Sequence, residues 1–142
     1  MIWSQVFISG SKSRPHVRAA VAHSLGLPVE RVVAISSFES DAEVDADALV
    51  ECREIEGDFQ LQCLVVVKAG AEEGDLPTPV SGAVAMARFL STLVLVSDDS
   101  PNPYTWLLAD PSGVVSQVAV DLDTFDDGGE LRIDHAWQPP DR

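Results

Sequence analysis

The chain has 142 residues with 9 Lys and Arg against 23 Asp and Glu, a net charge of −14, and apolar residues make up 46% of it. This length fits one globular domain over residues 1–142, with a short tail near residues 138–142, and the apolar fraction suffices for a core. The negative charge repels nucleic acid and anionic membranes, and no signal peptide or membrane-spanning run is visible, so we expect a cytoplasmic protein that binds neither.

The N-terminal part predicts a strand, a helix and a second strand. Residues 2–9 alternate loosely between apolar and polar side chains, which is typical of a strand. Ser13 suits an N-cap, Pro15 lies in the first helical turn and Gly26 supplies the stop, so a helix is expected between them. Residues 31–38 contain a β-branched apolar run and predict a buried strand.

The middle of the chain predicts an acidic loop followed by a hairpin. Residues 39–47 hold five carboxylates among nine residues, so we expect an acidic loop. Residues 49–56 and 59–68 read as the two arms of a β-hairpin. Residues 69–77 contain glycine, glutamate and proline and predict another loop.

The remaining third predicts a second helix and several strands. Thr78 and Pro79 open the helix as cap and first residue. Residues 93–96 could form its last turn or a separate strand, and we favour the strand because β-branched residues alternate there. Further strands separated by turns are expected at residues 104–109, 114–122 and 131–133. The fold class is therefore α+β, a mostly antiparallel sheet interrupted by two helices in the order strand, helix, three strands, helix, several strands.

The two cysteines, Cys52 and Cys63, flank a turn at Gly57 and Asp58. A two-residue loop there pairs residues whose numbers sum to 115, which places the cysteines opposite each other. They would occupy a hydrogen-bonded site with α-carbons about 5.5 Å apart, where a disulfide is geometrically allowed. A three-residue loop fits the apolar pattern equally well. We expect free thiols, because cytosolic proteins rarely keep a disulfide.

The negative charge is concentrated in two stretches. Residues 39–58 and residues 98–134 each hold nine acids and one base, a net charge of −8, whereas residues 1–38 carry +3. If the two stretches meet in space they form one strongly negative surface, and if they do not, each is a solvated rim. Tyr104 and Trp106 lie close to the second stretch and could serve either as binding anchors or as core residues.

No motif for catalysis, a cofactor or a metal is complete. The acidic runs that begin at Asp41 and Asp121 start like calcium loops, but their twelfth positions are Cys52 and Arg132 where glutamate is needed. The sequence at 10–13 ends like a phosphate-binding loop and lacks the earlier glycine. We therefore expect a protein that is not an enzyme, with no catalytic residues, no cofactor and no metal site.

The segment LVLVSDDSPNPYTWLLADPSG at residues 93–113 resembles bacterial immunity proteins of polymorphic toxin systems, as does the short acidic layout with a helix-interrupted sheet. The resemblance implies a cytoplasmic protein that occludes the active site of a cognate toxin. The acidic balance suits a basic toxin, for instance a nuclease whose nucleic-acid groove the carboxylates would fill. Binding would then be fast, tight and sensitive to salt.

The expected partner-binding residues are carboxylates of the second acidic stretch, together with Tyr104 as an aromatic anchor. The carboxylates are Asp98, Asp99, Asp121, Asp123, Asp126, Asp127 and Glu130. Two other functions remain open. One is a secretion adaptor or chaperone that binds an effector without inhibiting it. The other is a small-molecule-binding α+β domain, which requires an apolar pocket with a few convergent polar groups.

Overall fold

A computed structural model describes residues 2–35, 45–68, 76–98, 102, 104–121, 125 and 129–134. Its strands are β1 (Ile2–Ile8), β2 (Val32–Ile35), β3 (Ala48–Glu54), β4 (Leu61–Val67), β5 (Val94–Ser97), β6 (Thr105–Ala109) and β7 (Val115–Ala119). Its helices are α1 (Arg14–Leu25), the short 3-10 helix η1 (Val29–Arg31) and α2 (Pro79–Leu90). The predicted α+β class and order of elements are confirmed.

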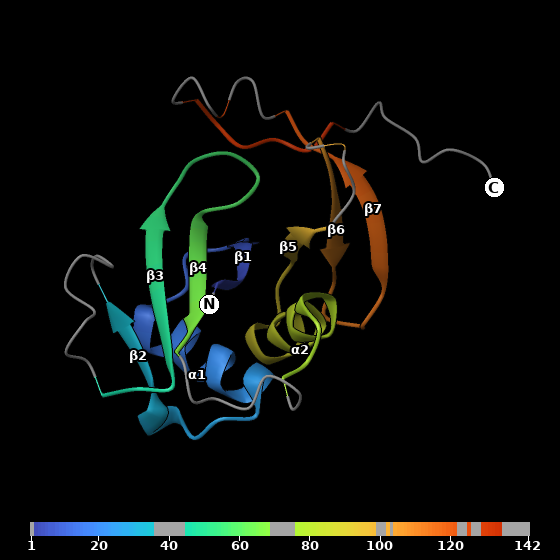
Figure 1. Cartoon of the computed structure of the whole chain (residues 1–142). Coiled ribbons are helices and arrows are strands. Elements are labelled where there is room, and N and C mark those ends of the chain that lie inside the picture. Colours follow the sequence, from blue (N-terminus) through green and yellow to red (C-terminus); the bar gives the residue numbers. More distant parts are fainter. Residues whose placement is uncertain are drawn as a thin grey trace.

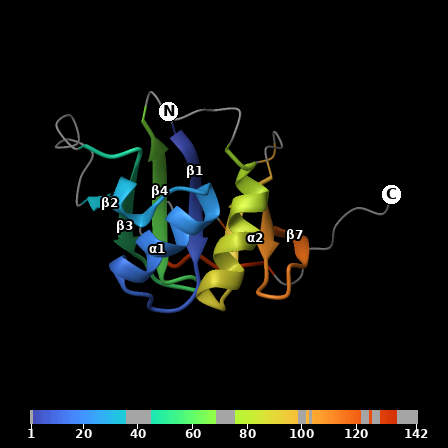
Figure 2. The same cartoon turned by 90° about the horizontal axis from the view of Figure 1, so that it is seen from below.

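The seven strands form one sheet in the order β2-β3-β4-β1-β5-β6-β7 (Figure 1). β2 runs parallel to β3, and every other pair of neighbours is antiparallel. The sequence did not predict the parallel pair. Both helices lie side by side on one face of the sheet, as Figure 2 shows. They carry three arginines (Arg14, Arg18 and Arg88) and no carboxylate.

Helix ends follow the capping signals of the sequence. The Ser13 hydroxyl accepts the backbone N–H of His16 at 3.3 Å, and the Thr78 hydroxyl accepts that of Ser81 at 3.2 Å. Each bond satisfies one of the N–H groups that have no partner within the helix. α2 ends before residue 93, so the strand preferred at 93–96 is confirmed in substance as β5.

The larger core lies between the helices and the sheet. Val6 and Ile8 of β1 are fully buried and belong to one core cluster with residues of α1 and α2. Trp3 packs its ring against α2 at Gly82, and the indole N–H donates to the carbonyl of Pro77 at 3.1 Å. A Cβ at position 82 would overlap the Trp3 ring. Glycine in this helix therefore permits the close packing of β1 and α2.

A second core lies on the opposite face of the sheet. Phe7 meets Trp106 edge to face, with ring centroids 5.4 Å apart. Phe59 from the β3–β4 loop and Leu131 from the C-terminal part are fully buried in the same cluster. Trp106 is thus a partly buried residue packed against this core, and the anchoring role considered for it has no support.

Three predicted elements differ from the structure. The start of the strand at 31–38 is wound as η1, because Arg31 N–H bonds back to the carbonyl of Pro28 at 2.9 Å. Tyr104 is a turn residue that precedes β6. Residues 131–133 do not form a strand and make only isolated bridges. Most of the loops predicted at 39–47 and 69–77, and the tail at 138–142, lie outside the described residues.

The register of the β3–β4 hairpin is the one whose paired residue numbers sum to 115, and Cys52 lies opposite Cys63. Both thiols are free, as expected. The predicted hydrogen-bonded site is wrong. Ile55 N–H bonds to Gln60 and Lys68 N–H bonds to Asp47, so the odd-numbered residues of β3 carry the ladder bonds. The cysteines therefore occupy a non-hydrogen-bonded site.

We predict that Gly82→Ala destabilises the protein. In the interior of a helix alanine is more favourable than glycine by about 1 kcal/mol. Here, however, the added methyl group would overlap the Trp3 ring. Overpacking of this kind costs about 1–3 kcal/mol, so the free energy of unfolding should fall in urea titrations. Ser81→Ala, at an exposed position of the same helix, is the control and should change stability by less than about 0.5 kcal/mol. Equal or higher stability of Gly82→Ala would contradict the packing described.

Candidate functional site

Residues 129–134, called the strap below, connect two distant parts of the sheet. Leu131 forms a bridge with Gly57 in the β3–β4 loop, and Ile133 forms a bridge with Val120 after β7. In Figure 1 the strap is the red segment between the hairpin and β7. It lies over the second core, on the face of the sheet opposite to the helices, because Leu131 is buried there.

Backbone hydrogen bonds fix the strap at both ends. Leu131 N–H donates to the carbonyl of Glu56 at 2.8 Å, and Asp58 N–H donates to the carbonyl of Leu131 at 2.8 Å. At the other end the backbone N–H of Asp121 donates to the backbone carbonyl of Arg132 at 3.0 Å. The Asp58 carboxylate also accepts Ile133 N–H at 2.8 Å. These bonds hold a segment without regular secondary structure against the sheet.

Gly57 is required at the point of contact. Its φ of 116° lies in a region that L side chains rarely adopt. A Cβ there would also overlap the carbonyl oxygen of Leu131. The Gly57-Asp58 turn that the sequence marks thus reverses the chain and also forms the position on which the strap packs.

The strap brings the two acidic stretches of the sequence together. The hairpin end of residues 39–58 meets the end of residues 98–134, because Glu56 and Asp58 bond directly to the strap. Six carboxylates lie on the strap or on the segments that it joins. This group, called the strap surface below, comprises Glu54, Glu56, Asp58, Asp121, Glu130 and Asp134, of which all but Glu130 are exposed. The merged acidic surface exists for this part of both stretches.

Two shallow depressions mark the strap surface. One of about 490 Å³ lies at the hairpin and is lined by residues that include Glu54, Glu56 and Gly129. Another of about 540 Å³ lies near β7 and is lined by residues that include Tyr104 and Asp121. Arg132 also lines the second depression and forms an ion pair with Glu130. The surface therefore offers a partner one phenol, two guanidinium groups (Arg53 and Arg132) and a larger number of carboxylates, and this excess of carboxylates suits binding of cationic groups.

The predicted partner-binding residues are distributed unevenly. Tyr104, with 42% of its surface exposed, lines the same depression as Asp121. Glu130 lies next to this depression, because it forms an ion pair with Arg132, which lines it. Asp98 does not belong to the strap surface. Its carboxylate accepts from the Gln117 amide at 3.2 Å, and Gln117 pairs with Leu107 on the helix side of the sheet. The other four, Asp99, Asp123, Asp126 and Asp127, lie outside the described residues.

Sequence reasoning missed the contribution of the hairpin. Glu56, Asp58 and Asp134 were counted within acidic stretches but not assigned to the site. The signal that could have indicated them is Leu131, an apolar residue between charged neighbours at the end of the chain. Such a residue needs a place to be buried, and the hairpin supplies it.

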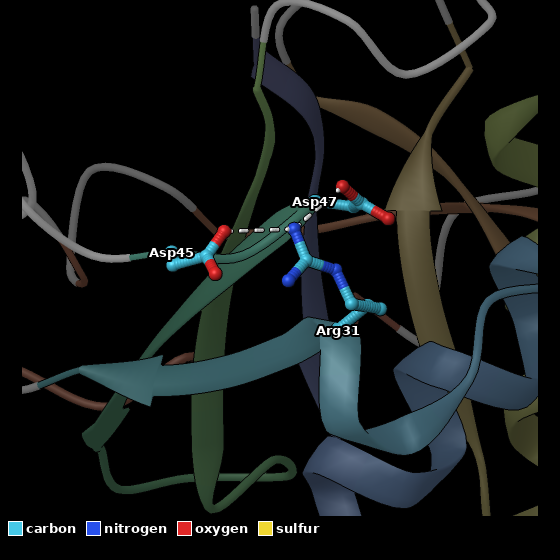
Figure 3. A network of polar contacts seen from close by, with 3 residues as sticks. All are labelled: Arg31, Asp45 and Asp47. Carbon is cyan, nitrogen blue, oxygen red and sulfur yellow. Dashed lines mark hydrogen bonds and ion pairs between the residues drawn. The ribbon is translucent and has the colours of Figure 1, made fainter.

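A separate acidic group lies at the other end of β3. The Arg31 guanidinium contacts the carboxylates of Asp45 and Asp47, each at 3.1 Å (Figure 3). Hydrogen bonding to Arg31, followed by its charge, lowers the pKa of Asp45, and the two carboxylates raise the pKa of Arg31. β3 has seven residues, so a rise of about 3.3 Å per residue puts this group roughly 20 Å from the hairpin tip. The described part of this acidic stretch, residues 45–58, is thus divided between two locations.

In the parts of the chain with assigned positions, no three His, Cys, Asp or Glu side chains are grouped closely enough to hold a metal ion. No helix in those parts is long and apolar enough to cross a membrane.

Arg31→Gln should raise the pKa of Asp45 toward its ordinary value, because both the charge-assisted hydrogen bond and the positive charge are lost. A carboxylate whose pKa is lowered by folding adds stability above its unfolded pKa, and that stability is lost as the pH falls through the folded pKa. The variant should therefore lose less stability than wild type on acidification below about pH 4. Carboxyl titration by NMR tests this.

Asp110 is the internal control for that titration. Its pKa is lowered chiefly by the Ser112 hydroxyl, with help from backbone N–H groups of the β6–β7 turn. Its titration should be the same in wild type and Arg31→Gln. An unchanged Asp45, or a joint shift of Asp45 and Asp110, would contradict the local ion-pair explanation.

Leu131→Ala should release the strap. Leu131 is fully buried, and truncation of such a leucine costs about 2–5 kcal/mol. The free energy of unfolding should decrease by an amount in that range. The Asp58 amide should exchange hydrogen faster, since it donates to the Leu131 carbonyl. Val114→Ala, at a side chain that is 57% exposed, should be nearly neutral. A similarly small effect of Leu131→Ala would show that the strap is not anchored by this side chain.

The sequence matches no family model, and comparisons with curated proteins and with solved structures gave no significant match.

Proposed function

We propose that this protein is a binding protein that neutralises a basic toxin by covering the toxin's active site. The observation that carries the proposal is the strap surface. Two acidic stretches that are separate in the sequence meet there, through the bonds between Glu56, Asp58 and the strap. A solvated acidic rim needs no such convergence.

The strap surface has the chemistry of an electrostatically guided interface. Each described carboxylate on it except Glu130 is exposed, and Glu130 is paired with Arg132. Clustered carboxylates repel one another in the isolated protein, and this repulsion is relieved when cationic groups of a partner approach. Such complementarity mainly accelerates association and selects against wrong partners.

Tyr104 supplies the apolar contact that charge alone lacks. It is 42% exposed and lines the depression that also holds Asp121. An exposed tyrosine presents a rigid ring together with a hydroxyl, a combination enriched at interface hot spots. In this proposal the carboxylates guide the partner and Tyr104 contributes to the lifetime of the complex.

Association kinetics test the surface. Glu56→Gln combined with Asp121→Asn removes two charges from the strap surface, and we expect the association rate with the partner to fall roughly 3- to 10-fold at low salt. The difference should shrink in concentrated salt, where exposed charges are screened. Stopped-flow or surface-based kinetics with the purified partner provide the measurement.

The matched control removes the same two charges elsewhere. Glu30→Gln with Asp45→Asn changes residues in η1 and before β3, and its association rate should stay near that of wild type. If both double variants slow equally, net charge alone acts and the strap surface is not the interface.

The partner is to be identified by affinity capture from the host organism with elution along a salt gradient, followed by co-expression. Relief of the partner's toxicity supports neutralisation. Binding without relief supports the secretion adaptor or chaperone considered above, which could use the same surface. Tyr104→Ala should weaken binding in either case, chiefly through faster dissociation.

A further inference from the structure

The β3–β4 hairpin holds the only two cysteines of the chain in direct contact. The Sγ atoms of Cys52 and Cys63 lie 3.3 Å apart. Both belong to the larger core, Cys63 with no exposed surface and Cys52 with 8%. None of the proposed binding steps uses them.

Backbone geometry at this pair already suits a disulfide. The cysteines lie directly opposite at a non-hydrogen-bonded site of the ladder, where α-carbons are about 4.5 Å apart. Disulfides span α-carbon distances of about 4.4–6.8 Å. A bond of about 2.0 Å between the sulfurs therefore requires rotation of the side chains and little movement of the strands.

The surroundings assign different roles to the two thiols. The pKa of Cys52 is lowered, chiefly by its hydrogen bond with Cys63 and also by the nearby Arg14 charge, against the opposing effects of burial and Glu51. The same hydrogen bond and burial raise the pKa of Cys63. The thiolate is the reactive form of cysteine, so a lowered pKa at the thiol that reaches the surface favours Cys52 as the first to react. Cys52 is also the more accessible of the two.

We propose that Cys52 and Cys63 form a site of oxidative modification at which hydrogen peroxide converts the two thiols into an intramolecular disulfide. The Cys52 sulfur attacks one peroxide oxygen, the O–O bond breaks, and the released hydroxide takes a proton to become water. The Cys63 sulfur then attacks the resulting sulfenic sulfur, the S–O bond breaks, and the departing hydroxide takes the Cys63 proton to form a second water. The two thiols together lose two electrons and two protons, and one peroxide takes up both and is reduced to two waters.

The separation of 3.3 Å between the sulfurs places the second step at an attack distance. Condensation should therefore outrun further oxidation of the sulfenic acid to sulfinic acid. The disulfide would close a ring containing residues 53–62, including the loop that receives the strap. It would pin the two arms directly below that loop and raise the unfolding temperature, because it restricts the unfolded chain.

The test treats the reduced, folded full-length protein with hydrogen peroxide and follows thiol content and intact mass. Thiols titrated after denaturation should fall from two per chain to none, and the mass should fall by two hydrogen atoms. An unreduced digest should contain the Cys52 peptide linked to the Cys63 peptide. The melting temperature should rise and should return to its starting value after dithiothreitol treatment.

Single variants separate the two roles. Cys63→Ser should leave a sulfenic acid at Cys52 that dimedone traps, whereas Cys52→Ser should leave Cys63 unmodified in the folded chain. If a variant does not fold, dimedone trapping during the wild-type reaction identifies the first cysteine oxidised. Persistence of two thiols, a sulfinic acid in place of the disulfide, or disulfide-linked dimers would each overturn the proposal. None of these readouts requires a binding partner, so failure here is distinct from failure of the proposed function.

Discussion

Leu131 reaches the tip of the β3–β4 hairpin only because Gly57 has no side chain. The bridge between these residues and the buried Leu131 side chain hold the strap over the second core. The depression at the hairpin, the burial of Phe59 in the same core and the meeting of the acidic stretches all occur around this contact. The strap thus obtains its position from a close backbone approach and one anchoring leucine, without a strand ladder of its own.

The fold illustrates how local signals determine some elements and leave others undetermined. Ser13 and Thr78 are caps whose chemistry acts within a few residues, and the helices begin where these residues predict. The hairpin was located by its turn, and of the two registers that the turn allowed the structure has the one that pairs Cys52 with Cys63. The parallel pairing of β2 with β3 could not be predicted, since it depends on how a long connection is routed.

The candidate site was predictable only in part for the same reason. Charge counting located both acidic stretches, and Tyr104 with Asp121 do share a depression. Counting could not show that Asp98 faces the helix side through Gln117, because that depends on strand parity in β7. Nor could it show that Arg31 holds Asp45 and Asp47 apart from the hairpin. The hydrogen-bonding phase of Cys52 and Cys63 was wrong because a register fixes partners but not which pairs carry the bonds.

The absence of carboxylates from α1 and α2 has a consequence for the whole molecule. The helices with their three arginines cover one face of the sheet, and Asp58, whose carboxylate bonds to the strap, lies on the side of the second core. These helix arginines and this carboxylate add a component of charge asymmetry across the thickness of the sheet to the net charge of the protein. A charged neighbour exerts a torque on such a molecule at distances of about a Debye length, roughly 8 Å at physiological salt. Rotation would present the strap to a cation before the two surfaces touch.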